Sequence, residues 1–153
     1  MTVAVACDHG GFPLKATVIA CVRAAGHQVL DLGTDSEAAV DYPDYARAAA
    51  EAVQQGRAER AVVLCGSGVG AAVVANKLKG IRAGVCHDVY SAHQAVEHDD
   101  VNVLALGARV VGASLAEELV RTFLAARYTG EERHARRLAK VAALETRWGE
   151  GRS

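Results

Sequence analysis

Hydrophobic residues along the chain fall into short continuous runs, separated by longer segments of mixed character. Runs rich in Val, Ala, Leu and Cys are typical of strands buried on both faces, because a half-buried strand alternates apolar and polar positions. The segments between the runs have the apolar spacing of helices. The pattern predicts strands at Val3–Cys7, Gln28–Asp31, Ala61–Cys65, Arg82–Cys86 and Val103–Leu106, and helices at about 12–25, 43–55, 69–78, 89–97, 113–127 and 131–147.

This alternation of strands and helices indicates an α/β protein. Parallel strands need crossover connections, which place helices on both faces of the sheet. We therefore expect a three-layer, Rossmann-like fold with a five-stranded parallel sheet and a C-terminal helix, in a single domain over residues 1–153. Only the polar end from Glu131 to Ser153 changes character, and we expect its helix to pack on another subunit.

Chemically active side chains follow three of the predicted strands. Cys7-Asp8-His9-Gly10-Gly11 ends the first, Cys65-Gly66-Ser67-Gly68-Val69-Gly70 the third, and Gly107-Ala108-Arg109 the fifth. Ligands of open α/β sheets bind beyond the carboxyl ends of the strands. A thiol, a carboxylate, an imidazole and a guanidinium could therefore converge at one edge.

The glycine-rich segment from Cys65 to Gly70 can turn tightly from strand to helix and point several N–H groups at one anion. It lacks the full dinucleotide-binding spacing and is not a GxxxxGKS phosphate loop. A thiol at a helix start is favoured as a thiolate, which makes Cys65 a candidate base or nucleophile. The alternatives are a turn without a ligand, and a small buried residue that ends a strand. Asp8 could equally cap a helix.

Composition removes several classes of function. The net charge of −1, from 17 basic and 18 acidic residues, gives no general attraction to nucleic acid or to an anionic membrane. The four cysteines form no CxxC pair, so we expect free thiols and no structural metal site. The start of the chain resembles a strand rather than a signal peptide, and we expect a cytoplasmic protein. We interpret Cys7, Cys21 and Cys86 as buried packing residues, and His27, His87 and His93 as surface or core histidines.

Two arginines in the polar end lie four residues apart. Arg133 and Arg137 share one helix face, where two guanidiniums could hold a phosphate. The alternative is a solvated basic face.

Taken in order and spacing, several segments resemble the B-type ribose 5-phosphate isomerases over nearly the whole chain. The resemblance also includes the Arg133/Arg137 pair. The segments are Cys7-Asp8-His9-Gly10-Gly11-Phe12, Asp41-Tyr42-Pro43, Cys65-Gly66-Ser67-Gly68-Val69-Gly70, Ala75-Asn76-Lys77, Ile81-Arg82-Ala83 and Asn102-Val103-Leu104-Ala105-Leu106-Gly107-Ala108-Arg109.

The resemblance implies isomerisation of an open-chain sugar phosphate through a cis-enediolate, without a metal or an organic cofactor. Some members use a glutamate base at the position of Ala71, which leaves Cys65 as the implied base here. The remaining roles are implied in the same way. They are Ser67 with the N–H groups of Gly68, Val69 and Gly70 for the enediolate oxygens, Gly66 for substrate binding, Asp8 for hydroxyl protons, Tyr42 for the sugar, His98 for ring opening, and His9, Arg109, Arg133 and Arg137 for the phosphate.

Asp99 departs from the family, which usually carries asparagine there and uses it to bind substrate. An ionised aspartate can only accept hydrogen bonds. Either Asp99 accepts from a sugar hydroxyl and ribose 5-phosphate remains the substrate, or the substrate is allose 6-phosphate, galactose 6-phosphate or a tetrose phosphate. An alternative of another class is a non-catalytic phosphosugar-binding module.

His98 closes a helix that runs back from the carboxyl edge of the sheet, so we expect it near the opposite edge from Cys65. A two-fold homodimer would bring His98 and the tail arginines to the partner's site. Such dimers could pair further into a tetramer.

Overall fold

Five parallel strands form one sheet in the order β2-β1-β3-β5-β4. In this computed structural model, which describes residues 1–150, the strands are β1 (Thr2–Cys7), β2 (Gln28–Asp31), β3 (Arg60–Cys65), β4 (Ala83–Val85) and β5 (Val103–Gly107). From β1 the chain first adds β2 on one side and then continues through β3 on the other. The direction of winding therefore reverses between β1 and β3, which is where α/β sheets bind ligands.

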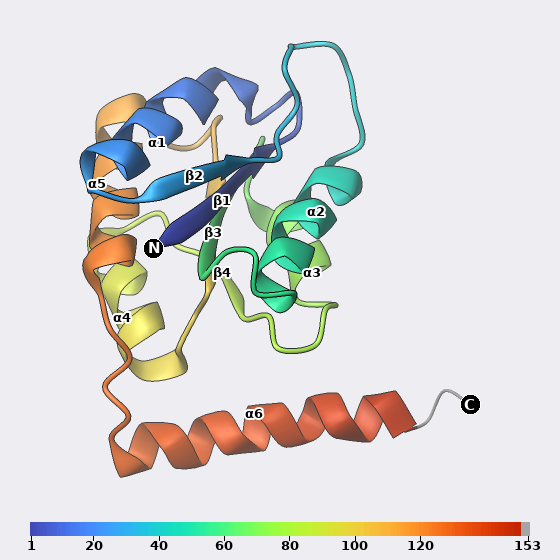
Figure 1. The fold of residues 1–153 in the computed structure, drawn as a ribbon, viewed down its shortest axis with the longest axis vertical. Coiled ribbons are helices and arrows are strands. Elements are labelled where there is room, and N and C mark those ends of the chain that lie inside the picture. Colours follow the sequence, from blue (N-terminus) through green and yellow to red (C-terminus); the bar gives the residue numbers. More distant parts are fainter. Residues whose placement is uncertain (151–153) are drawn as a thin grey trace.

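Helices cover both faces of the sheet, as the alternation predicts (Figure 1). They are α1 (Phe12–Ala24), α4 (Val89–Asp99) and α5 (Ala113–Ala125) on one face, and α2 (Tyr42–Gln54) and α3 (Val69–Ala75) on the other. The core under α2 and α3 consists largely of alanine, which lets both helices lie close to the sheet. The predicted three-layer α/β fold is confirmed.

The prediction that all strands are buried on both faces is wrong for the two edge strands. Both β2 and β4 keep partly exposed side chains, whereas β1, β3 and β5 are buried almost throughout. An edge strand has a neighbour on one side only, and its short apolar run does not reveal this position.

The helix predicted over 69–78 ends earlier, at Ala75, because the Asn76 side chain bonds to another element. Its amide donates to the Ala83 carbonyl at 2.9 Å and accepts from the Ala83 N–H at 2.8 Å. Asn76 thereby takes the place of a strand neighbour at the start of β4, and β4 is shorter than the predicted Arg82–Cys86.

The C-terminal helix α6 (Glu132–Glu150) runs along one end of the molecule and extends past the sheet (Figure 1). Most of its described side chains are exposed, including Val141 and Leu144. No helix within residues 1–150 is both long and apolar enough to cross a membrane. The predicted single domain includes residues 151–153, which lie outside the described part of the chain.

Candidate active site

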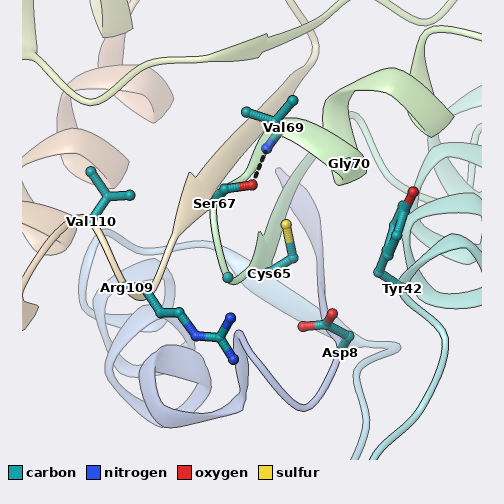
Figure 2. Close-up of a pocket in the computed structure, with 9 residues that line it drawn as sticks. Asp8, Tyr42, Cys65, Ser67, Val69, Gly70, Arg109 and Val110 are labelled. Atoms are coloured by element: carbon teal, nitrogen blue, oxygen red, sulfur yellow. Dashed lines mark hydrogen bonds between the residues drawn. The ribbon is translucent and has the colours of Figure 1, made fainter.

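The carboxyl ends of β1, β3 and β5 border an open cavity of about 520 Å³. Asp8 follows β1, Cys65 ends β3, and Arg109 comes two residues after β5. The cavity is lined by Asp8, Tyr42, Cys65, Gly66, Ser67, Val69, Gly70, Arg109 and Val110. Residues far apart in the sequence thus meet at the sheet edge where the sequence places a site (Figure 2).

The Cys65 thiol lies in the turn between β3 and α3. Its Sγ accepts a hydrogen bond from the Gly68 N–H at 3.0 Å, and the side chain is 5% exposed. Gly68 has φ +81°, a conformation that favours glycine. The contact fixes the position of the Sγ atom in the turn.

Ser67 and Tyr42 border the thiol from the two sides of this turn. The Ser67 Oγ accepts from the Val69 N–H at 3.2 Å, which leaves its own hydroxyl proton free for a ligand. The Tyr42 ring packs so closely on Gly70 that a Cβ there would lie 2.7 Å from it. Gly70 therefore allows Tyr42 to form one wall of the cavity (Figure 2).

Asp8 has a structural contact and also lines the cavity. One carboxylate oxygen accepts from the Gly11 N–H at 2.9 Å and holds the start of α1. The neighbouring His9 accepts from the Val40 N–H through Nδ1 at 3.1 Å, so the proton of its neutral ring is on Nε2. Both residues are therefore oriented by backbone N–H groups.

Arg109 supplies a positive charge to the cavity. The backbone N–H of Arg109 donates to the Gly66 carbonyl at 3.1 Å, and the guanidinium of its side chain packs on Gly66. Figure 2 shows the guanidinium and the Asp8 carboxylate extending toward each other from opposite sides below Cys65. Within residues 1–150 the Arg109 side chain forms no ion pair, so it can bind an anion.

Two predicted site residues, His9 and Gly68, are next to lining residues in the sequence but do not line the cavity themselves. Four other predicted site residues that do not line this cavity in the described chain belong to other elements. They are His98 and Asp99 at the end of α4, and Arg133 and Arg137 in the first turns of α6. The His98 Nδ1 bonds to the Gln94 amide nitrogen at 3.0 Å. Since that amide nitrogen can only donate, the proton of the neutral His98 ring is on Nε2.

The four residues at the end of α4 and the start of α6 form a second group, the α4–α6 cluster. His134 also belongs to this cluster and was not predicted as a site residue from the sequence. Its buried ring stacks on His98 with 4.0 Å between centroids. Burial lowers the pKa of His134, and the charges of His98 and Arg133 act in the same direction. Its Nε2 is buried without a hydrogen-bond partner in the described chain. A histidine between two arginines of a polar helix resembles a solvated residue, so no sequence signal reveals this contact.

Metal ligands are not gathered in the part of the chain that the structure describes. No three His, Cys, Asp or Glu side chains there are grouped as a metal ion would require. The residues suited to bind a ligand are instead the N–H donors, the hydroxyl and the guanidinium around Cys65, a set that fits a small oxygen-rich anion.

The fold and this site together define an α/β protein with a cavity suited to a small oxygen-rich anion, and the comparisons specify its family. Residues 3–141 match the profile of the family described as Ribose/Galactose Isomerase. The chain belongs to this family and is a sugar-phosphate isomerase, an intramolecular oxidoreductase.

Three relatives show how close the similarity is. Ribose-5-phosphate isomerase B of Escherichia coli (strain K12) is 45% identical over 145 residues, which are 95% of this chain and 97% of that protein. D-erythrulose-4-phosphate isomerase of Pectobacterium atrosepticum is 39% identical, over 85% of this chain and 86% of that protein. The structure of ribose-5-phosphate isomerase B from Clostridium thermocellum superposes with a TM-score of 0.94 at 43% identity, covering 97% and 99% of the two chains.

The four free cysteines differ in their surroundings, which predicts an order of alkylation. Burial raises the pKa of Cys7 to about 11, and it raises the pKa values of Cys21 and Cys86 as well. At pH 8 these thiols are therefore mostly protonated and slow to react. Cys65 faces the cavity and accepts an N–H bond, so iodoacetamide should label it first.

Peptide mass spectrometry over a time course measures this order, with Cys65→Ser as the control. Faster labelling of Cys21 or Cys86 in the wild type would contradict the assignment of Cys65 as the reactive thiol.

Proposed function

We propose that this enzyme interconverts ribose 5-phosphate and ribulose 5-phosphate through a cis-enediolate, with Cys65 as the base. The observation that carries the proposal is the Cys65 Sγ, held 3.0 Å from the Gly68 nitrogen in a cavity that also contains a hydroxyl and a guanidinium. The identity of 45% to the E. coli enzyme supports the choice of a pentose phosphate. No metal or organic cofactor takes part in the proposed reaction.

The proposed reaction moves two protons. The Cys65 thiolate takes the proton from C2 of the open-chain aldose and returns it to C1, which makes the ketose. Asp8 transfers a hydroxyl proton from O2 to O1, so the net charge of the sugar is the same before and after the reaction. The Ser67 hydroxyl and the N–H groups at the start of α3 stabilise the negative charge on the enediolate oxygens.

The position that carries a glutamate base in some members of the family supports Cys65 here. Ala71 occupies it, with only 1% of its surface exposed, in the first turn of α3. A methyl group cannot take a proton, so this position cannot supply the base here. Cys65 is therefore the group best placed to act at carbon.

We propose further that the working enzyme is a cytoplasmic homodimer with shared sites. Arg109 and His9 would bind the phosphate from one subunit, and Arg133 and Arg137 from the other. The support is that the α4–α6 cluster does not line the cavity of its own chain. In addition, Val141 and Leu144 of α6 are 48% and 55% exposed, so this helix offers apolar surface to a partner.

Asp99 raises a second candidate substrate. It is exposed at the end of α4, where its carboxylate could accept from a sugar hydroxyl at the partner's site. The 39% identity to a tetrose-phosphate isomerase makes another phosphosugar the alternative. Ribose 5-phosphate remains the first proposal because the aspartate keeps one of the two hydrogen-bonding roles of asparagine.

Removing the thiol should abolish isomerisation without unfolding the protein. Cys65→Ala is expected to lower kcat on ribose 5-phosphate about 10²–10⁴-fold, the contribution typical of a general base. The measurement is ribulose 5-phosphate formation in buffer containing EDTA. Cys21→Ala, which truncates a buried thiol on α1, is the matched control and should keep the activity.

Conversion of only a four-carbon or six-carbon phosphosugar by the wild type would overturn the proposed substrate and implicate Asp99. Inactivity on every phosphosugar would favour the binding module.

Mixing two inactive variants tests the shared site. Cys65→Ala and His98→Asn homodimers should both be inactive, whereas a mixed dimer has one site with both wild-type residues. After unfolding and refolding an equimolar mixture, random pairing should restore about a quarter of the wild-type activity. If each site used its own His98, the mixture would stay inactive.

A further inference from the structure

His87 follows β4 and accepts a hydrogen bond from β5 at a position where β4 has already ended. The two strands pair Ala83 with Val103, Gly84 with Leu104 and Val85 with Ala105. The same register would place residue 87 beside Gly107, but β4 ends at Val85. Because the Ala108 N–H donates to the Cys65 carbonyl of β3, the preceding Gly107 N–H faces the β4 side.

The His87 side chain supplies the acceptor that the strand would have provided. Its Nε2 accepts from the Gly107 N–H at 2.9 Å, and the residue is half-buried. An accepting Nε2 carries no proton, so the neutral ring has its proton on Nδ1. Without this ring, the Gly107 N–H would lose its partner at the end of a buried strand.

Gly107 is the residue at which the end of β5 meets the turn between β3 and α3. A Cβ on Gly107 would come within 2.6 to 2.8 Å of the Ser67 backbone, so this glycine lies directly against the turn that holds Cys65. The Gly107 carbonyl accepts from the Val110 and Val111 N–H groups at 2.9 and 3.0 Å. These bonds close the turn that carries Arg109.

We propose that His87 is a positioning residue of the phosphosugar site. By accepting the Gly107 N–H, it fixes the turn after β5, and with it the Arg109 guanidinium and the contact on Ser67. His87 itself does not line the cavity. The expected change in KM rests on the proposed function, whereas the expected change in amide hydrogen exchange can be measured without a substrate.

Two substitutions distinguish the effect of losing the hydrogen-bond acceptor from the effect of losing the volume of the ring. His87→Leu fills a similar volume without an acceptor, whereas the side-chain oxygen of His87→Gln reaches to about the position of Nε2. His87→Leu is expected to raise KM for ribose 5-phosphate about tenfold, with a smaller change in kcat, and His87→Gln should stay within about threefold of the wild type. His93→Leu, which removes the ring bonded to Glu97 on α4, is the matched control and should leave KM unchanged.

Amide hydrogen exchange gives a readout that is independent of the substrate. Exchange at Gly107, Ala108 and Arg109 should be at least about tenfold faster in His87→Leu than in the wild type, and close to the wild type in His87→Gln. A wild-type KM and wild-type exchange in His87→Leu would overturn the proposal. So would equal defects in the Leu and Gln variants, because a purely structural role does not depend on the acceptor.

A measurement on the wild type keeps the proposal testable if His87→Leu does not fold. The nitrogen chemical shifts of the His87 ring at neutral pH should show an unprotonated Nε2 and a proton on Nδ1. The opposite tautomer, with the proton on Nε2, would overturn the proposal because that nitrogen could not accept from Gly107. Failure of the enzyme to convert ribose 5-phosphate would leave this result and the exchange data unaffected.

Discussion

The site depends on how closely the end of β5 approaches the turn after β3. No Cβ can be accommodated at Gly107, where it would lie 2.6 Å from Ser67, and a Cβ at Gly68 would lie 3.0 Å from Leu106. This contact lets Ala108 and Arg109 donate to the carbonyls of Cys65 and Gly66. Backbone hydrogen bonds therefore fix the thiol and the guanidinium relative to each other, and such preorganised groups need little rearrangement when charge develops on a substrate.

The sequence predicted the parts of the structure that depend on local pattern. The apolar runs located all five strands, and the glycines and polar residues after β1, β3 and β5 identified the edge that contains the cavity. Features that depend on packing between distant elements could not be predicted. The exposure of β2 and β4 follows from strand order, and the roles of His87 and His134 follow from register and from the contact between α4 and α6. Nothing adjacent to either histidine in the sequence signals these contacts.

The separation of charged groups explains why a second subunit is part of the proposal. Among residues 1–150 a single arginine, Arg109, lines the cavity, and a bound phosphate gains from more than one cation. Arg133 and Arg137 are exposed on a helix that extends past the sheet, and His98 is held beside them by Gln94 and His134. With a net charge of −1 the whole molecule attracts no anion, so this local grouping has to supply the attraction.

Proton transfer by Cys65 is the central chemical claim, and solvent isotope incorporation tests it most directly. Ribose 5-phosphate would be incubated with the enzyme in D₂O, and deuterium at the carbons beside the carbonyl would be followed by NMR. Transfer through the thiol predicts deuterium incorporation by the wild type, and incorporation no faster than in buffer for Cys65→Ala. Deuteration at the wild-type rate in Cys65→Ala would contradict the assignment of Cys65 as the base.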